Sequence, residues 1–448
     1  MSMDELYDIA ITGGHILTLD HDFTEYDDGL ILVKNGRIAY VGERKSYPDE
    51  VRANRIINAT NRLIMPTFFN AHTHLSVSLY RGLGTDLRLH EWLEQVIWPL
   101  EKRFCTPENV YLGSCLSLLE MIRSGTGTLA DMNFYSTYAA KAIEESGLRG
   151  FLGEALFSSP TPSVQDPEDG FSVTEGLLER YGNHPLLHVY LVLHAPFTCS
   201  ESLYHQAGEF AHHHQIKICS HVAETKREVD SFLANFNRTP VGWLQDSGVL
   251  SSDFIAIHGV HLTEEDKQIF VDKGVSVIHN PHSNMMLGSG ICDVPDLVSR
   301  GIRVGLGTDS ASSNNSLSML NELQTAAKLH KMNRLDPSVL PAKEVILMAT
   351  GVNSAIFGLG NTTGVLSQGF SADFMIIDAA ASNMLPDYDP YAQIAYSMEN
   401  ENILTTVVAG RMLMEDRKVL TMDEEVILKE VKKWMTHASV HDFILLQK

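Results

Sequence analysis

The chain has 448 residues, and its 34 Lys and Arg against 56 Asp and Glu give a formal net charge of −22 with histidine neutral. Apolar residues make up 44% of the chain and charged residues 20%, a globular balance that argues against disorder. The negative surplus repels phosphate, so we expect neither nucleic acid nor a membrane as a partner.

The N-terminus and the cysteines indicate the compartment. The first residues, MSMDELYD, are acidic and lack the basic and apolar regions of a signal peptide. The sequence contains no uncharged apolar run of about 18 residues, the length of a membrane-spanning helix. The five cysteines are scattered and never occur in CxxC spacing, which fits reduced thiols. We therefore expect a cytoplasmic protein.

Both ends of the chain are predicted to form short β-strands. Residues 8–17 and 29–41 are rich in β-branched residues and are bounded by turn signals. The C-terminal part of the sequence contains similar short runs. Because chain termini commonly lie close together, we expect residues 1–62 and 366–448 to form one composite β-rich domain.

The middle of the chain alternates between short apolar runs and longer stretches with helical periodicity. Eight runs are predicted as buried strands, at residues 63–70, 127–132, 149–157, 188–195, 216–221, 254–258, 275–280 and 303–308. This alternation favours an α/β fold, namely a (β/α)₈ TIM-type barrel over residues 63–365. An open doubly wound sheet is the alternative, although no Gly-x-Gly-x-x-Gly motif follows the first strand.

The first of these runs leads into the motif His72-Thr73-His74. Positions i and i+2 of a strand face the same side, so both imidazoles point into one space. In a barrel, the C-terminal end of a strand opens into the active-site mouth. An HxH motif by itself remains a weak indication of a metal site.

Ionisable residues follow three later strands at the same end of the predicted barrel. They are His221 and Glu224 after the fifth run, His258 after the sixth and Asp309 after the eighth. An unpaired ionisable group next to a buried strand is costly. Imidazole and carboxylate ligands suit Zn²⁺ or a similar divalent ion, with one position left for water. The combined set therefore predicts a metal centre.

The order HxH, HxxE, His and Asp resembles the amidohydrolase superfamily, whose fold is a metal-bearing (β/α)₈ barrel. Within this superfamily, the sequence resembles the 5′-methylthioadenosine/S-adenosylhomocysteine deaminase branch in particular. Six segments carry this resemblance: NAHTHLSVSLYRGLGTDLRLHEWLEQVIWPL (70–100), LHAPFTCS (193–200), SHVAET (220–225), HGVHL (258–262), HNPHSNMML (279–287) and GLGTDSASSNN (305–315). Triazine hydrolases share much of this pattern.

By this resemblance, one divalent metal per chain, Zn²⁺ with Fe²⁺ as the alternative, is held by His72, His74, His221 and Asp309. The implied catalytic residues are Glu224 as proton shuttle, His258 as the contact of the metal-bound water, and Asp309 as acceptor of that water's proton. A divalent ion lowers the pKa of its water toward about 7. A carboxylic acid then protonates the ring nitrogen, where negative charge develops.

The resemblance also implies the substrate contacts. Glu101 matches a carboxylate that accepts hydrogen bonds from ribose hydroxyls, and His194 matches a histidine on the ribose side. Glu224 and Asp309 complete this set. From the residues alone, a helix-surface charge and a core histidine are the simpler interpretations of Glu101 and His194.

The sequence departs from the family pattern after the third strand. Glu154 stands where the family has an arginine that holds the homocysteine carboxylate, and residues 157–173 contain no basic residue. A carboxylate tail is expected to meet repulsion there instead of a bidentate clamp. We therefore expect Glu154 to face the substrate tail. The sequence assigns no role to His282, which is expected near the barrel mouth.

The sequence thus predicts a metal-dependent hydrolytic deaminase that converts a 5′-substituted adenosine to the inosine analogue and ammonia. Methylthioadenosine or adenosine is favoured over S-adenosylhomocysteine. One alternative keeps the metal barrel but acts on an s-triazine, another purine or a pterin. The other is a non-catalytic scaffold, which has no need to bury so many titratable groups. The expected partner is a small nucleoside, and the sequence leaves open whether the chain forms a homo-oligomer.

Overall fold

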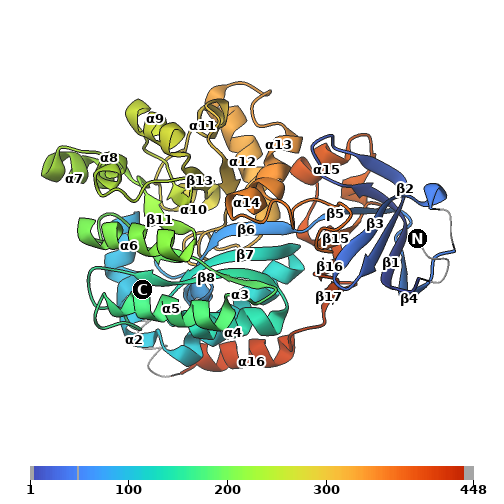
Figure 1. Ribbon diagram of the computed structural model, residues 1–448, viewed down its shortest axis with the longest axis horizontal. Helices are drawn as coiled ribbons and strands as arrows, with labels where there is room; N and C mark the ends of the chain where they lie inside the picture. The colour runs from blue at the N-terminus through green and yellow to red at the C-terminus, as the bar shows by residue number, and fades with distance from the viewer. Residues whose placement is uncertain (1–4, 48–49, 438–448) are drawn as a thin grey trace.

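Two β-sheets organise the computed structural model, which describes residues 5–47 and 50–437 (Figure 1). One sheet is built from both ends of the chain and lies to one side of the molecule, and the other is formed by the middle of the chain. The expected combination of a parallel barrel with a composite terminal sheet is confirmed. Among the helices of the described residues, none has the length and apolar character needed to cross a bilayer.

The terminal sheet joins strands from the two ends of the chain. The N-terminal part supplies β1 (Tyr7–Leu17), β2 (Glu25–Lys34), β3 (Arg37–Glu43), β4 (Ala53–Asn58) and β5 (Arg62–Pro66). The C-terminal part supplies β15 (Phe374–Asp378), β16 (Ile403–Val408), β17 (Arg411–Glu415) and β18 (Lys418–Val419). The two groups meet where β5 and β15 pair antiparallel, with Ile64 opposite Ile376. Both side chains are buried in one apolar core with Ile11, Ile31 and Phe374.

The parallel sheet forms the barrel. Its strands are β6 (Phe68–Thr73), β7 (Thr126–Asn133), β8 (Arg149–Leu156), β9 (Leu187–Val189), β10 (Leu191–Leu193), β11 (Ile218–Val222), β12 (Phe254–His258), β13 (Ser276–His279) and β14 (Val304–Leu306). Neighbouring strands pair in chain order, with β9 beside β8. All residues of β7, β8, β11 and β12 are buried, because these strands are covered both inside and outside the barrel.

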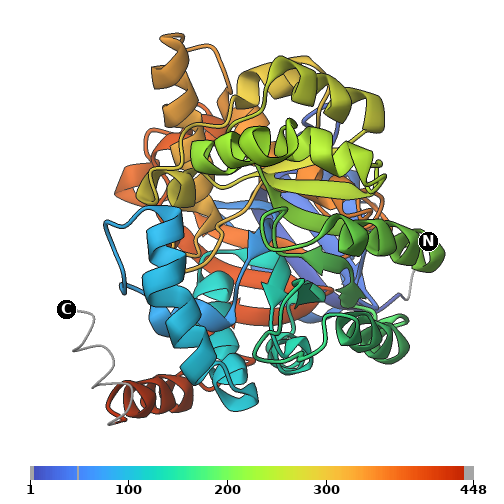
Figure 2. The ribbon, with the colours of Figure 1, turned by 90° about the vertical axis from the view of Figure 1, so that its left-hand side faces the viewer.

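Helices surround these strands (Figure 2). They are α3 (Pro107–Arg123), α4 (Ser136–Ser146), α5 (Asp169–Tyr181), α6 (Glu201–His214), α7 (Lys226–Phe236), α8 (Pro240–Asp246), α9 (Glu264–Lys273), α10 (Pro281–Met286), α11 (Val294–Ser299), α12 (Met319–Arg334), α13 (Ala342–Met348) and α14 (Gly351–Ile356). The connection from β6 to β7 also contains η2 (Ser76–Tyr80), α1 (Leu89–Trp92), the π-helical η3 (Leu93–Ile97) and α2 (Trp98–Phe104). The remaining short elements are η1 (Arg44–Ser46), η4 (Ser382–Met384), α15 (Pro390–Tyr396) and η5 (Asn400–Asn402).

Side chains complete the barrel between its last and first strands. The Asn70 amide donates to the Thr308 hydroxyl (2.7 Å) and accepts from the Thr308 backbone N–H (3.0 Å). One residue further along, the Asp309 N–H donates to the His72 carbonyl (2.9 Å). Gly307 permits this approach, since a Cβ there would lie 2.7 Å from the His72 nitrogen. The seam therefore fixes Asp309 beside the HxH motif.

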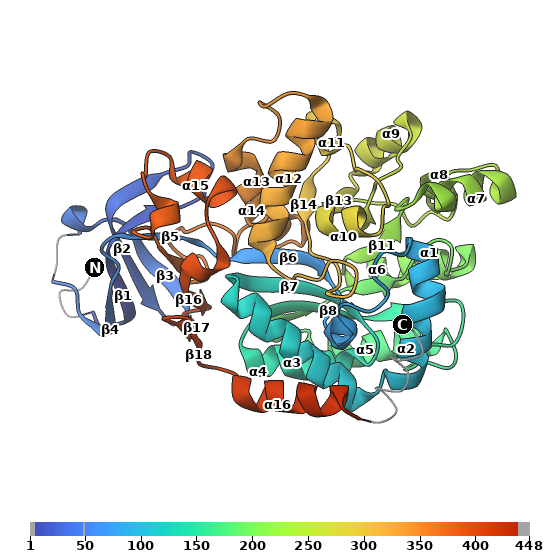
Figure 3. The same ribbon diagram turned by 180° about the vertical axis from the view of Figure 1, so that it is seen from behind.

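Two segments differ from the sequence prediction. The apolar run 63–70 is not one barrel strand, because β5 ends at Pro66 in the terminal sheet and β6 begins at Phe68 in the barrel. Both strands are buried, so hydrophobicity alone carries no sign of the change of sheet. The last helix, α16 (Glu424–Met435), lies along α3 of the barrel and not on the terminal sheet (Figure 3). Its Trp434 ring lies 6.1 Å from that of Tyr80.

A buried ion pair connects the barrel to the terminal sheet. Arg149, at the start of β8, donates to the Asp373 carboxylate (3.0 Å) and to the Ser371 hydroxyl (2.9 Å). The other Asp373 oxygen accepts from the Ala409 N–H (2.6 Å). Arg149 and Asp373 are each 3% exposed, so the charges have exchanged water for each other and for these hydrogen bonds.

We expect Arg149→Met to destabilise the protein by about 3–5 kcal/mol, because it leaves the Asp373 carboxylate buried without its counter-charge. Urea unfolding followed by circular dichroism measures the loss. The control is Lys226→Met, which removes an exposed ion pair with Asp230 and should cost about 0–1 kcal/mol. A loss for Arg149→Met no larger than the control's would contradict the account of the pair.

Candidate active site

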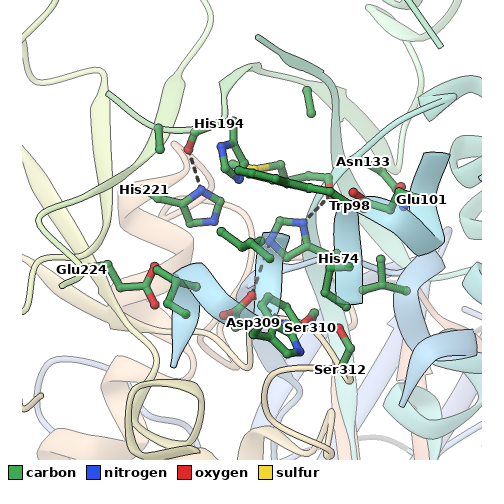
Figure 4. Close-up of a pocket in the computed structure, with 18 of the residues that line it drawn as sticks. His74, Trp98, Glu101, Asn133, His194, His221, Glu224, Asp309, Ser310 and Ser312 are labelled. Atoms are coloured by element: carbon green, nitrogen blue, oxygen red, sulfur yellow. Dashed lines mark hydrogen bonds and ion pairs between the residues drawn. The ribbon is translucent and has the colours of Figure 1, made fainter. Parts of the chain in front are cut away.

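A pocket opens at the C-terminal ends of the barrel strands (Figure 4). Most of the predicted site residues line it: His74, Glu101, His194, His221, Glu224, His258 and Asp309. His72 does not line the pocket and is 1% exposed, and its Nε2 contacts that of His221. In Figure 4, Glu224 and Glu101 lie on opposite sides of His74 and Asp309. The pocket therefore has a cluster of possible metal ligands between two carboxyl groups.

Three imidazoles and one carboxylate converge at the base of this pocket. The Nε2 atoms of His72 and His221 are 3.2 Å apart. Asp309 Oδ1 lies 3.5 Å from His72 Nε2 and 3.4 Å from His74 Nε2. These atoms come from the ends of β6 and β11 and from the loop after β14, so three separate parts of the barrel bring possible ligand atoms together around His72.

The hydrogen bonds of the outer ring nitrogens fix which nitrogen carries the proton. His74 Nδ1 faces the Met132 carbonyl at 2.8 Å, and His221 Nδ1 faces the His194 carbonyl at 2.5 Å. A carbonyl can only accept, so both Nδ1 atoms donate and both Nε2 atoms keep a lone pair. Lone pairs directed at one point beside a carboxylate are the arrangement that a divalent cation requires. The site therefore fits a divalent metal.

The charges of the cluster agree with this fit. Burial lowers the pKa of His72, and burial lowers that of His221 well below its usual range, so both rings stay neutral. Burial opposes ionisation of Asp309, but the neighbouring His72 and His74 rings, whose Nε2 atoms lie 3.5 Å and 3.4 Å from Oδ1, outweigh it and hold the Asp309 pKa well below its ordinary value. Burial also opposes a proton on His74, but Asp309 outweighs it and raises the His74 pKa. The cluster therefore combines two neutral imidazoles, a third ring at which a proton competes with a cation, and an ionised carboxylate.

Three residues at the rim have a left-handed backbone. The φ angles are +51° at Ala223, +74° at His258 and +60° at Asp309. Non-glycine residues rarely adopt this conformation, and such strain concentrates at functional sites. Here it turns the chain at the end of each strand, so that the side chain of Asp309 points back toward the histidines.

His258 differs from the other imidazoles in its partners. Its Nδ1 lies 3.3 Å from the Asn280 amide nitrogen and 3.2 Å from that of Asn284. With two N–H donors on Nδ1, the ring proton belongs on Nε2, which lies 3.5 Å from Glu224 Oε2. Burial lowers the pKa of His258 to about 3, so the ring is neutral. His258 is thus arranged as a hydrogen-bond donor.

Glu224 is buried beside the cluster and not within it. Its Oε1 accepts from the Ser289 hydroxyl (3.1 Å), which leaves Oε2 directed toward His258. Burial, followed by the nearby charges of Asp309 and Glu228, raises the pKa of Glu224 well above its usual range. A carboxylic acid that holds its proton at neutral pH can donate it to a bound molecule.

The far wall of the pocket comes from the connection after β6. Its helix contains a π-helical turn at Leu93–Ile97, an element that is frequent at functional sites. The longer turn brings both Trp98 and Glu101 to the pocket, together with Trp92. Burial raises the pKa of Glu101 to about 7. Nothing among the described residues donates a hydrogen bond to the Glu101 carboxyl group, which is free to accept one from a ligand.

His194 follows β10 on the same side of the pocket. Its ring stacks on Phe157 at 4.4 Å, and its Nδ1 lies 2.8 Å from the Thr198 hydroxyl. Burial lowers the pKa of His194 to about 3. The fixed, neutral ring therefore presents its remaining nitrogen to the pocket.

The structure does not place Glu154 where we expected it. Glu154 is 1% exposed and does not line the pocket. Its carboxylate accepts the backbone N–H groups of Tyr135 (3.2 Å) and Ser136 (3.0 Å) and the hydroxyls of Ser136 and Ser163. It satisfies the N-terminus of α4, where Tyr135 has a left-handed backbone and offers no side-chain cap.

The structure also explains His282 and adds residues that the sequence did not indicate. His282 lies between Glu322 and Thr325 at 2.8 Å from each, so it attaches α10 to α12. The pocket further contains Asn133, Ser310 and Ser312. Asn133 ends β7 and Ser310 follows Asp309, so the signal was their position at strand ends.

We expect Glu154→Gln to destabilise the fold by about 1–3 kcal/mol, because its amide group would turn an N–H toward donors that need an acceptor. Thermal unfolding measures this loss. The matched control is Glu168→Gln on the exposed surface, which should change stability by about 0.5 kcal/mol or less. Equal stability of the two variants would show that Glu154 does not cap α4.

Comparison with known proteins places this site in a family. The chain is 39% identical to a 5-methylthioadenosine/S-adenosylhomocysteine deaminase of Syntrophobacter fumaroxidans, over 95% of this chain and 97% of that one. It is 37% identical to a 5′-deoxyadenosine deaminase of Methanosarcina barkeri, over 95% of this chain and 97% of that one. A zinc-bound adenosine deaminase from Xanthomonas campestris superposes with a TM-score of 0.94 at 28% identity, covering 99% of both chains.

More distant structures share the fold. An atrazine chlorohydrolase from Arthrobacter aurescens superposes with a TM-score of 0.86 at 22% identity, over 95% of this chain and 99% of that one. The model of the amidohydrolase family matches residues 63–413, which include the whole barrel and the site. This protein therefore belongs to the amidohydrolase family.

Proposed function

We propose that this amidohydrolase removes the 6-amino group of an adenosine with a neutral 5′-substituent, methylthioadenosine or adenosine itself, and releases the inosine analogue and ammonia. The observation that supports this proposal most directly is a single pocket. In it, a buried acid, Glu224, and a free carboxyl group, Glu101, lie on opposite sides of the His/Asp cluster. The relatives named as deaminases of 5′-substituted adenosines support the same reaction.

In this proposal the metal is Zn²⁺, held by His72, His74, His221 and Asp309. His72, His74 and Asp309 form one possible ligand group, and His72 and His221 form another with His258. The zinc-bound structural relative supports the choice of ion. Such an ion lowers the pKa of its water to about 7 and so supplies the nucleophile at neutral pH.

The residues of the chain move the protons. Glu224 delivers its proton to the ring nitrogen beside the reacting carbon, because negative charge develops there as water adds. Asp309, which is ionised before the reaction, accepts a proton from the attacking water, and the His258 Nε2–H group orients that water. Asp309 then passes this proton to the amino group, the C–N bond breaks and ammonia leaves, and the hydroxyl group on the tetrahedral carbon gives its proton to Glu224 as the carbonyl forms.

The opposite wall would hold the nucleoside. Glu101 accepts hydrogen bonds from ribose hydroxyls, and its placement 27 residues after His74 depends on the π-helical turn. The His194 ring lies on the same side, while Trp92 and Trp98 supply flat apolar surface for the base. An s-triazine has no ribose, so a free carboxyl group at Glu101 would serve no purpose for it.

The pocket lining favours an uncharged 5′-tail. It contains the carboxyl groups of Glu101, Glu224 and Asp309 and no Lys or Arg among the described residues. Its apolar part includes Val77, Leu89 and several other large side chains. A tail carboxylate would lose its hydration without gaining a cation.

The proton shuttle can be tested by Glu224→Gln. The amide keeps the shape but holds no transferable proton, so kcat should fall about 10²–10⁴-fold or more while the metal content stays unchanged. Ammonia release from methylthioadenosine and elemental analysis measure the two quantities. The control is Glu209→Gln on the exposed face of α6, which should behave like the wild type. Retained activity, or loss of the metal, would remove Glu224 from this role.

Substrate selectivity tests the charge of the pocket. We expect kcat/KM for S-adenosylhomocysteine to be at least about tenfold below that for methylthioadenosine, a difference of about 1.4 kcal/mol in transition-state binding. Because Glu154 does not line the pocket, Glu154→Gln should leave this ratio unchanged. Equal efficiency on the two substrates in the wild type would contradict the argument from the lining.

A further inference from the structure

A second buried carboxylate lies behind Glu224. Glu228, in the first turn of α7, is 3% exposed and does not line the pocket. Its Oε1 accepts the backbone N–H of Ala223 (3.1 Å) and its Oε2 accepts that of Glu224 (2.9 Å). Both oxygens therefore bind the short segment from which the Glu224 side chain projects.

The backbone of Ala223 and Glu224 requires hydrogen-bond partners from outside the strand. Ala223 adopts a left-handed backbone with φ of +51°, an unfavourable conformation for a residue with a Cβ. The strand β11 ends at Val222, so the N–H groups of the next residues have left the ladder. Glu228 replaces these lost partners and so fixes the direction in which the chain leaves the strand.

A second contact fixes the carboxyl group of Glu224 itself. The Ser289 hydroxyl donates to Glu224 Oε1 at 3.1 Å. The Ser289 carbonyl accepts from His261 Nε2 at 2.6 Å, and the His261 N–H donates to the Ala223 carbonyl at 2.9 Å. The loops after β11, β12 and α10 are thereby tied together around Glu224.

We infer that Glu228 and Ser289 are positioning residues for the proton shuttle, Glu228 through the backbone of Glu224 and Ser289 through its carboxyl group. This inference rests on the proposed function, in which Glu224 delivers a proton. Ser289 occupies Oε1, so Oε2 is the oxygen that carries the transferable proton toward the pocket.

The hydrogen-bond donors around Glu224 and Glu228 also indicate which of the two carboxyl groups holds a proton. Burial raises the pKa of Glu228 to about 7, and the backbone N–H groups of Ala223 and Glu224 limit that rise by stabilising the ionised form. Glu224 accepts a hydrogen bond from the Ser289 hydroxyl, and its pKa is raised well above the usual range. Two ionised carboxylates in this buried site repel each other, and the charge of Glu228 raises the pKa of Glu224, so a proton on one of them is favoured. The pattern of donors leaves that proton on Glu224, the residue that transfers it.

The test compares Glu228→Gln and Ser289→Ala, each alone and combined with Glu224→Gln, in the metal-loaded protein. Misplacing a reacting group by about 1 Å costs up to about 100-fold in rate. We therefore expect kcat on methylthioadenosine to fall about 10- to 100-fold in each single variant, with KM nearly unchanged. In the Glu224→Gln background, neither substitution should lower kcat further. Ser289→Thr, which keeps the hydroxyl, should restore activity lost in Ser289→Ala.

The matched control is Asp266→Asn. Asp266 is buried in the first turn of α9, and its side chain accepts the Thr263 N–H at 2.9 Å, so it supports a helix start as Glu228 does but away from the pocket. Its variant should lose thermal stability and keep kcat.

Three outcomes overturn the inference: wild-type kcat in Glu228→Gln and Ser289→Ala, an equal fall in the Glu224→Gln background, or no rescue by Ser289→Thr. If Glu228→Gln fails to fold, the Ser289 variants decide. Full activity of Glu224→Gln would instead refute the proposed function itself, so the two failures are distinguishable.

Discussion

The closure of the barrel between β14 and β6 is the constraint on which the site depends. Hydrogen bonds between Asn70 and Thr308 replace the missing strand ladder, and the next backbone bond sets Asp309 against His72. The carboxylate thus reaches histidines that precede it by more than 230 residues. Without this seam, the imidazoles would lack the charge that makes their lone pairs a cation site.

Identical side chains take different roles because their partners differ. Backbone carbonyls on the outer nitrogens of His74 and His221 leave lone pairs toward the cluster. The amide N–H groups of Asn280 and Asn284 face the outer nitrogen of His258, so its ring proton is instead on Nε2, the nitrogen directed toward the cluster. The two carboxyl groups also differ through their surroundings: the neighbouring imidazoles lower the pKa of Asp309, and burial raises that of Glu224. The chemical role of each side chain in the pocket is therefore decided by the groups that surround it.

The sequence predicted the barrel and the gathering of the polar residues because both follow from simple periodicity. Strand alternation puts His72 and His74 on one side, and parallel strands bring their C-terminal ends to one mouth. Glu154 could not be placed this way, since its partners are backbone N–H groups at a helix start whose geometry no pattern reveals. The role of Glu228 likewise depends on the left-handed turn at Ala223, and the change of sheet at Thr67 lies within a continuous apolar run.

The central claim is that four side chains from three separate parts of the barrel form one metal centre in an amidohydrolase that deaminates nucleosides. Elemental analysis of active wild-type protein, beside parallel analysis of Asp309→Asn, tests it most directly. The account predicts about one equivalent of a divalent metal per chain in the wild type and a clear loss of metal in the variant. Less than about 0.2 equivalents in fully active protein, or equal metal content in the two, would contradict it.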